Sequence, residues 1–315
     1  MVPEKIRGSN SRIVAWQVRR GGAVSMSEGL KLRCIDGATG SELERRGVDL
    51  SLPLWSSRAL LDAPEVLADV HRDYLTAGAE AITTATFRTH RRSLEKAGLG
   101  DRASELTRQA VEIARTVRDE CRSDALVLGS VAPLEDCYRP DRVPDEEICL
   151  REHAELMEHL IDAGTDLILI ETINHLGEGR AAVEAARRVA PGRWIVSFCT
   201  RSEGQPGVLL SGEELAPFLS ELGDAQAVGV NCVVAGAMVD QVKLLRGSLP
   251  QTPILAYGNI GHADELGNWH SSDAVDPGCY AEYASSWIES GATIVGGCCG
   301  TTPEHIRAVV GNSLS

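Results

Sequence analysis

Eight short apolar segments recur along the chain at fairly regular spacing, and longer amphipathic stretches separate them. The segments are LKLRCID (30–36), EAITTATF (80–87), ALVLGSVAP (125–133), DLILIET (166–172), WIVSFCT (194–200), AVGVNC (227–232), PILAYGN (253–259) and ATIVGGCC (292–299). Several of them are apolar without alternation, which is typical of strands covered on both faces. The pattern therefore predicts eight buried parallel strands.

The stretches between these segments have the periodicity and the end signals of helices. The first predicted helix opens at Pro64, the helix over 145–164 closes on Gly164, and Thr302 followed by Pro303 marks the start of the last helix. The predicted helices cover 64–79, 102–122, 145–164, 179–190, 212–222, 235–247, 280–291 and 301–310. We interpret the long segment 260–280 as an extended loop.

Eight strand–helix units in series indicate either a (β/α)₈ TIM barrel or a doubly wound sheet. The glycine-containing turn DGATGSELERRG (36–47) lacks the GxGxxG spacing of a dinucleotide-binding sheet, which favours the barrel. We therefore expect an α/β protein with one barrel domain over residues 29–315, the usual size for that fold. Residues 1–28 are polar and arginine-containing, and we expect a disordered extension there.

The net charge of the chain argues against some classes of partner, and its cysteines indicate the cellular compartment. The net charge is −14, which argues against nucleic acid or an anionic membrane as partner. No apolar run of about 18 residues is present, so the sequence predicts no transmembrane helix. The nine cysteines are scattered, with no disulfide framework and no secretory signal, which predicts reduced thiols and a cytoplasmic protein.

Chemically active side chains stand at the ends of four predicted strands. Asp36 ends the first strand, Glu171 the fourth and Cys232 the sixth, while Cys298 and Cys299 end the eighth. In a barrel these ends meet at one face, where active sites form. Three thiols converging on one point are a soft ligand set with one open position, which suits Zn²⁺. Three thiolates make the zinc a weak Lewis acid for water but suit it to activate a substrate thiol, which implies alkyl transfer.

Three other interpretations of the cysteines stay open at this stage. Buried free cysteine behaves as a small hydrophobe. A structural zinc site would be closed by a fourth protein ligand such as His262. The adjacent pair Cys298-Cys299 would suit a vicinal-dithiol redox protein, which predicts a reversible disulfide and no stoichiometric metal.

The motifs GGCCGTTPEHI (296–306), VGVNC (228–232) and IDGATGSELERRG (35–47) resemble those of the homocysteine S-methyltransferase family, over roughly residues 32–310. The resemblance implies that Cys232, Cys298 and Cys299 bind Zn²⁺, with the sulfur of homocysteine as fourth ligand. It also implies that Asp36 and Glu171 hold the substrate ammonium group. The turn Gly37, Ala38 and Thr39 would meet the substrate carboxylate, as amide donors at a helix start favour an anion.

The chain departs from the family pattern in three loops around the site: at Ala85, at Ala132–Asp136 and at Gly258–His262. No segment resembles a cobalamin domain, so we expect a small donor such as S-methylmethionine, S-adenosylmethionine or a betaine. The partners implied are this donor and homocysteine, with methionine as product. A different thiol or selenol acceptor remains the alternative, and the sequence does not fix the oligomeric state.

Several further side chains near strand ends have both a structural and a functional interpretation. Asn231 and Asn259 would either orient loops or bind ligand. The histidines that follow strands are His90, His175, His262 and His270, and each is more often a solvated loop residue. The loop and pocket candidates are Trp55, Cys137, Tyr138 and Trp269.

Overall fold

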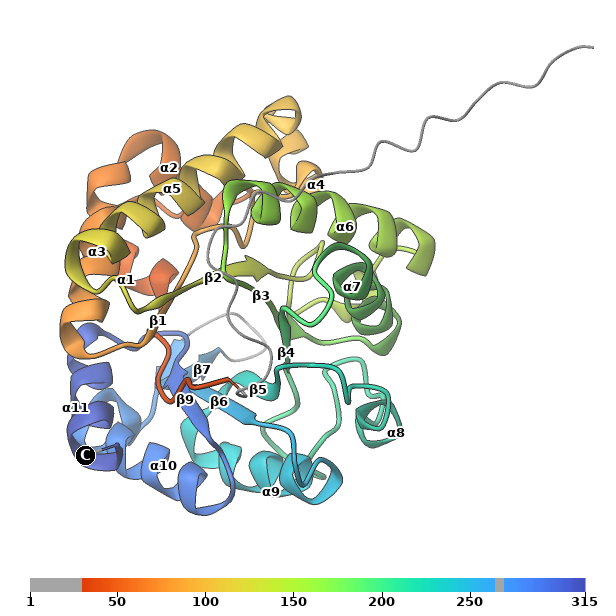
Figure 1. The fold of residues 1–315 in the computed structure, drawn as a ribbon. Helices are drawn as coiled ribbons and strands as arrows, with labels where there is room; N and C mark the ends of the chain where they lie inside the picture. Colours follow the sequence, from red (N-terminus) through yellow and green to blue (C-terminus); the bar gives the residue numbers. More distant parts are fainter. Residues whose placement is uncertain (1–29, 264–268, 315) are drawn as a thin grey trace, which may run out of the picture.

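The computed structural model describes residues 30–263 and 269–314, in which seven parallel strands curl into a barrel wrapped by helices (Figure 1). The strands are β1 (Ala81–Thr83), β2 (Leu126–Val131), β3 (Leu167–Ile173), β4 (Trp194–Phe198), β5 (Ala227–Val234), β6 (Ile254–Asn259) and β9 (Ile294–Gly297), and they neighbour one another in that order. The predicted extension 1–28 lies outside the described residues, so the domain limits stay a prediction. The predicted (β/α)₈ architecture is confirmed.

The first predicted strand, 30–36, is reduced to two isolated bridges that close the ring. Cys34 pairs in parallel with Val295 of β9, and Ile35 pairs in parallel with Ala81 of β1. The Asp36 carboxylate then accepts the N–H of Thr83 at 2.7 Å, so a side chain takes over where the backbone ladder would continue. The backbone pairing with β1 therefore ends at Asp36.

Helices cover the outside of the sheet, as the amphipathic stretches predict (Figure 1). The helices are α1 (Thr39–Arg45), α2 (Ala59–Asp62), α3 (Pro64–Ala77), α4 (Arg91–Glu95), α5 (Ala103–Cys121), α6 (Glu146–Ala163), α7 (Leu176–Val189), α8 (Ala216–Leu219), α9 (Met238–Ser248), α10 (Pro277–Glu289) and α11 (Pro303–Ser313). Short 3₁₀ turns lie at Trp55–Arg58, Gly100–Arg102, Pro140–Arg142, Ala235–Ala237 and Asp273–Val275. The end signals act as predicted: Gly164 caps α6 in the left-handed conformation, and Thr302 forms a capping box with His305.

Two sequence predictions are wrong in detail. The helix predicted over 212–222 shrinks to α8, because Val208 and Glu214 form an antiparallel bridge and the Glu213 carboxylate accepts the N–H of Leu176. The predicted loop 260–280 contains a hairpin, in which β7 (Gly261–Ala263) pairs antiparallel with β8 (Trp269–Ser271).

The buried side chains form two main layers, as expected for a barrel with a filled interior. An inner cluster fills the ring, with members such as Ile35, Leu169 and Leu255. A larger outer cluster lies between sheet and helices and includes Tyr74, Trp194 and Trp287. With both faces of the strands covered, the carboxyl ends are where polar side chains collect.

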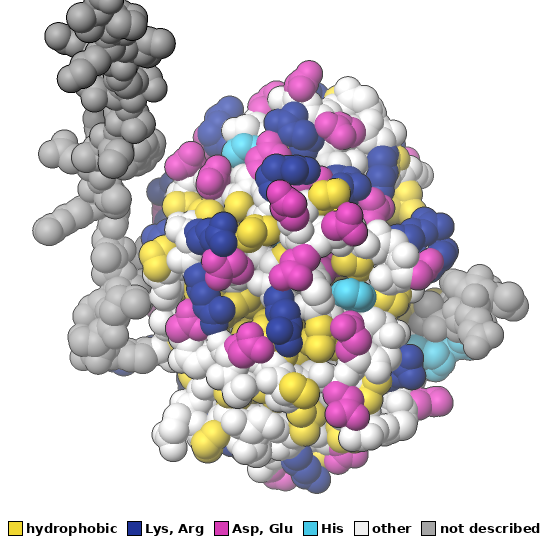
Figure 2. Space-filling view, turned by 90° about the vertical axis from the view of Figure 1, so that its right-hand side faces the viewer, with side chains coloured by type: hydrophobic (Ala, Val, Ile, Leu, Met, Phe, Trp, Pro, Cys, Tyr) yellow, Lys and Arg dark blue, Asp and Glu magenta, His cyan; other side chains and the backbone are white. Residues whose placement is uncertain are grey.

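Charged side chains of both signs lie on the surface of the molecule (Figure 2). On the face shown in Figure 2, acidic and basic side chains are interspersed. Many of them pair, such as Arg187 with Asp224 at 2.8 Å. Among the residues that the structure describes, no helix is long and apolar enough to cross a membrane.

Candidate metal centre and substrate pocket

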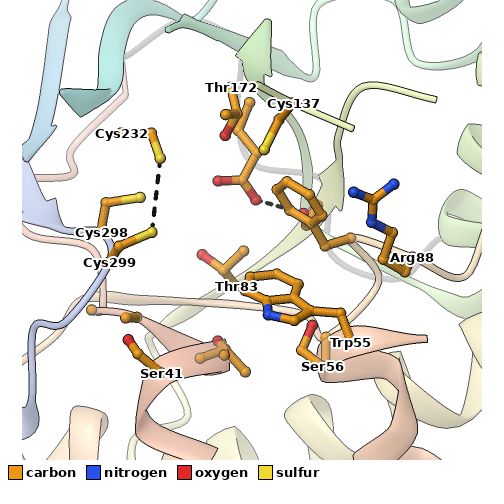
Figure 3. Close-up of a pocket in the computed structure, with 18 of the residues that line it drawn as sticks. Ser41, Trp55, Ser56, Thr83, Arg88, Cys137, Thr172, Cys232, Cys298 and Cys299 are labelled. Atoms are coloured by element: carbon orange, nitrogen blue, oxygen red, sulfur yellow. Dashed lines mark hydrogen bonds between the residues drawn. The ribbon is translucent and has the colours of Figure 1, made fainter. Parts of the chain in front are cut away.

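Three thiols meet at the carboxyl end of the barrel (Figure 3). Cys232 lies in β5, and Cys298 and Cys299 follow β9 directly. Their Sγ atoms all lie within 4.8 Å of one another, and those of Cys232 and Cys299 are 3.8 Å apart. The strand ends that the sequence predicts to be neighbours thus bring all three cysteines together.

Cys232 reaches this position through an unusual backbone conformation. Its φ is +58°, in the left-handed region that non-glycine residues seldom adopt. The pairing of β5 with β6 shifts register between Asn231 and Val234, which marks a bulge at this cysteine. Bulges next to active sites re-aim a side chain, and here the bulge turns the thiol toward Cys299.

The Asn231 side chain fills the gap that this distortion leaves. Its Oδ1 accepts the N–H of Thr172 at 2.9 Å and the hydroxyl of Ser197 at 2.8 Å. Its Nδ2 donates to the hydroxyl of Thr172 at 2.8 Å. Thr172 also has a positive φ, of 61°, at a second register shift, between β3 and β4. The fully buried Asn231 therefore fixes both bent strand ends, which is the loop-orienting interpretation of this residue.

The turn that carries Cys298 and Cys299 packs against the end of β6. The Cys298 N–H donates to the carbonyl of Gly258 at 2.9 Å, and the Cys299 N–H donates to Oδ1 of Asn259 at 3.0 Å. Gly300 has a φ of +83°, and a Cβ there would lie 2.4 Å from Ile260. Glycine at this position therefore lets the chain leave strand geometry and point both thiols inward.

The three thiols fit a tetrahedral metal ion. Sulfur ligands about 2.3 Å from a tetrahedral Zn²⁺ lie about 3.8 Å from one another, which is the separation of Cys232 and Cys299. Hydrogen bonds from three neighbouring thiols, those of Cys199, Cys298 and Cys299, lower the pKa of Cys232. The hydrogen bonds that Cys298 and Cys299 form with Cys232 raise their own pKa values. The cluster alone therefore favours a single thiolate, and a bound cation is what would ionise all three.

Within the described part of the chain, the cluster consists of the three cysteines alone. Among the described residues, no histidine or carboxylate joins the three cysteines. His262, the candidate for a closed structural site, instead stacks on His270 in the β7–β8 hairpin with ring centroids 5.5 Å apart. The phenol of Tyr138 lies 3.2 Å from the Cys232 sulfur. All three cysteines line the pocket, so a small ligand can approach the thiols from there.

Two buried carboxyl groups line the same pocket. Asp36 accepts the Thr83 hydroxyl at 2.8 Å, and burial raises its pKa from 3.8 to about 7. Glu171 accepts the hydroxyls of Ser130 at 2.5 Å and Tyr257 at 3.3 Å. Burial is also the main cause that raises the pKa of Glu171 from 4.5 to about 7, with the charge of Asp36 adding to it. Both groups would be stabilised as anions by a ligand cation.

The turn Gly37, Ala38 and Thr39 also lines the pocket and leads into α1. The Ala38 N–H is already engaged, because it donates to the Thr301 hydroxyl at 3.1 Å. The helix start has no side-chain cap, so the first amides of α1 are the donors that this turn offers to an anion.

The pocket has a volume of about 420 Å³, and its outer wall is largely apolar. Trp55 and Phe87 meet edge to face in this wall, with ring centroids 5.2 Å apart. Cys137 and Tyr138 line it as well. The lining residues that the sequence did not single out include Thr83, Arg88, Ser130 and Tyr257. Each lies in or just after a predicted strand, but a single polar residue there forms no sequence motif that would mark it as part of a site.

The histidines lie away from this pocket. His90 caps α4 and His175 caps α7, each accepting a backbone N–H. His262 and His270 belong to the β7–β8 hairpin. Trp269 is in the same hairpin and is exposed. Asn259 holds Cys299 in place, as described above, so it acts as a loop-orienting residue.

Fold and site together define a (β/α)₈-barrel enzyme with a cluster of three thiols and two acids at the carboxyl ends of its strands. The family model for homocysteine S-methyltransferase matches residues 33–312. The chain belongs to this family of methyltransferases.

Individual relatives align with this chain over most of its length and over most of their own length. Homocysteine S-methyltransferase YbgG of Bacillus subtilis is 30% identical over 298 residues, covering 87% of this chain and 92% of the relative. Selenocysteine methyltransferase of Astragalus bisulcatus is 32% identical over 310 residues, covering 87% and 90%. The crystal structure of the homocysteine methyltransferase MmuM from Escherichia coli in its metallated form superposes with a TM-score of 0.76. It is 29% identical and covers 90% of this chain and 97% of MmuM.

The raised pKa values of Asp36 and Glu171 predict a pH-dependent cost to stability. Both acids ionise near pH 4 in the unfolded chain but near pH 7 in the folded one. The folded state therefore holds more protons between these values, and stability is lost as the pH rises from about 4 to about 7. We expect the double variant Asp36→Asn, Glu171→Gln to gain stability relative to the unmodified chain across this window.

Urea unfolding of ligand-free, metal-depleted protein at a series of pH values measures this difference. The two proteins share every other titrating group, so the pH dependence of the difference isolates the two acids. A difference that stays constant with pH would show that the pocket already stabilises both carboxylates as anions.

Proposed function

We propose that this enzyme transfers a methyl group from a small cationic donor to the thiol of homocysteine, giving methionine, with one Zn²⁺ held by Cys232, Cys298 and Cys299. The observation that carries the proposal is the three-thiol cluster with an open side facing two buried acids in one pocket. MmuM, which shares the fold, has a metallated form, and this supports a bound metal in the present enzyme. Zinc follows from the donor set, because three thiolates are a soft tetrahedral site.

The metal and the protein have separate tasks in this proposal. When bound, Zn²⁺ lowers the pKa of a thiol that joins it while leaving the sulfur nucleophilic. The chain holds its three thiols in place through the bulge at Cys232 and the turn at Gly300. Asn231 and Asn259 keep these two segments fixed through the hydrogen bonds described above.

The amino-acid end of homocysteine would lie between the two acids and the start of α1. Asp36 and Glu171 bear one carboxyl group each in an enclosed pocket, and an ammonium group would draw both pKa values back down. The amides at the start of α1 then suit the substrate carboxylate. These contacts orient the thiol toward the donor, which is how positioning contributes to the rate.

The apolar wall suits the other substrate. Trp55 and Phe87 present ring surface to the pocket, and aromatic faces attract onium groups. The substrate sulfur attacks the methyl carbon in line, and the donor heteroatom keeps the electron pair of the broken bond. The wall also keeps water away from the reacting atoms.

A selenol acceptor is a second candidate, because relatives that act as selenocysteine methyltransferases are about as similar to this chain as those that act on homocysteine. Selenocysteine is one methylene shorter than homocysteine, so competition between the two acceptors at equal concentration distinguishes the candidates. The proposal also places the enzyme in a reducing compartment such as the cytoplasm, where free thiols persist.

Replacing a metal ligand should remove the metal and the activity together. We expect Cys298→Ala to lose the bound zinc and all detectable methyl transfer, because two thiols are too few for a stable site. Elemental analysis gives the metal content, and methionine formation gives the activity.

Cys121→Ala is the matched control, since Cys121 is exposed at the end of α5. This variant should keep one zinc per chain and full turnover. A folded Cys298→Ala protein with full activity would contradict the proposed zinc mechanism.

Replacing Glu171 should affect the acceptor rather than the donor. We expect Glu171→Gln to raise the KM for homocysteine about 10- to 100-fold, the cost of losing one charge-assisted contact in a buried site. The KM for the donor should change little. Steady-state kinetics with each substrate varied in turn measures both.

Glu80→Gln is the control, because Glu80 precedes β1 at the other end of the barrel and pairs with Arg33. Its kinetic constants should match those of the unmodified enzyme. An unchanged homocysteine KM in Glu171→Gln would exclude the proposed ammonium contact.

A further inference from the structure

Arg88 is a buried cation in the wall of the pocket. It follows β1 and Phe87, and only 9% of its surface is exposed. In Figure 3 its guanidinium lies on the opposite side of the pocket from Cys232, Cys298 and Cys299. The positive charge therefore lies in the pocket wall away from the three thiols (Figure 3).

The guanidinium lacks a charged partner within the described part of the chain. Its Nη1 donates to the carbonyl of Glu135 at 3.0 Å, and its carbon lies 5.6 Å from the Phe87 ring centre. The Nε–H is buried without any hydrogen-bond partner. By contrast, Arg91 and Arg92, one turn further on, pair with Glu155 and Glu152 at 2.7 Å.

The acids that line the pocket do not neutralise this charge. Asp36 and Glu171 accept hydrogen bonds from Thr83, Ser130 and Tyr257. Asp136 accepts the N–H of Tyr138 at 2.9 Å and forms no ion pair with Arg88. An arginine is a permanent cation, and a buried charge is costly without an opposite charge beside it. Within the described residues, the charge of Arg88 therefore has no anionic partner.

We propose that Arg88 binds a carboxylate of the methyl donor. The donor class is then a small sulfonium or quaternary ammonium compound that carries a carboxylate, such as S-methylmethionine or glycine betaine. A guanidinium matches a carboxylate with two parallel N–H donors, and in Arg88 only Nη1 has an acceptor among the residues that the structure describes. This assignment rests on the proposed function, and it names the residue that would position the donor.

The position of Arg88 assigns it to the donor rather than to the acceptor. The ammonium and carboxylate of homocysteine have their partners at Asp36, Glu171 and the start of α1, beside the thiols. In the transfer a carbon–sulfur bond forms at the acceptor, and the bond from the methyl group to the donor heteroatom breaks. The heteroatom keeps the electron pair and becomes neutral, while the donor carboxylate is unchanged and serves only to position the methyl group.

Donors with and without a carboxylate test this assignment. We compare kcat/KM for S-methylmethionine and glycine betaine with that for trimethylsulfonium, in Arg88→Gln, Arg88→Lys and the control Arg91→Gln. Arg88→Gln should lose about 10- to 100-fold for whichever carboxylate donor the enzyme uses. Trimethylsulfonium transfer and the homocysteine KM should stay the same, Arg88→Lys should recover part of the loss, and Arg91→Gln should match the unmodified enzyme.

Calorimetric titration of S-methylmethionine and of glycine betaine, with norleucine filling the acceptor side, gives the same comparison without turnover. At least one of the two compounds should bind more weakly to Arg88→Gln than to the unmodified enzyme, and equally well to Arg91→Gln. This result supports the carboxylate contact. Equal losses for donors with and without a carboxylate, no loss at all, or a raised homocysteine KM instead would each overturn it. If the unmodified enzyme transfers no methyl group from any donor, the proposed function fails, and the titration still decides the role of Arg88.

Discussion

The convergence of three thiols on one point is the constraint on which the rest of the site depends. Parallel strands alternate their side chains between two faces, so straight ends of β5 and β9 would not aim Cys232, Cys298 and Cys299 at one atom. Cys232 and Gly300 both adopt the left-handed backbone conformation, which lets the chain bring the three thiols together. Strain of this kind persists only where the surroundings hold it in place, and here the amides of Asn231 and Asn259 do so.

The pocket combines this cluster with separated charges that a ligand would neutralise. Asp36 and Glu171 are acids whose pKa values are raised by burial, on the acceptor side of the pocket. Arg88 is a buried cation without an anionic partner among the described residues, on the other side. An enclosed site with fixed charges of both signs is suited to zwitterionic substrates. The ligand-free protein carries the energetic cost of these charges, which substrate binding relieves.

Much of the fold and the main part of the site could be predicted from the sequence. Apolar runs gave seven strands, and Pro64, Gly164 and Thr302 marked helix ends correctly. The proximity of Cys232 to Cys298 and Cys299 followed from the predicted order of the strands. The hairpin β7–β8 and the shortening of α8 could not be predicted, because they depend on contacts between distant segments. The place of Arg88 and Ser130 in the pocket could not be predicted for the same reason. The role of a single polar residue in an apolar stretch depends on which residues surround it in the folded chain.

The central claim is that the three thiols hold a zinc ion that takes the substrate sulfur as a fourth ligand. X-ray absorption at the zinc edge, on protein with and without homocysteine, measures the number of sulfur neighbours directly. The account predicts one zinc per chain and a sulfur count that rises from three to four when homocysteine is added. A protein without metal, or a zinc environment that homocysteine leaves unchanged, would contradict it.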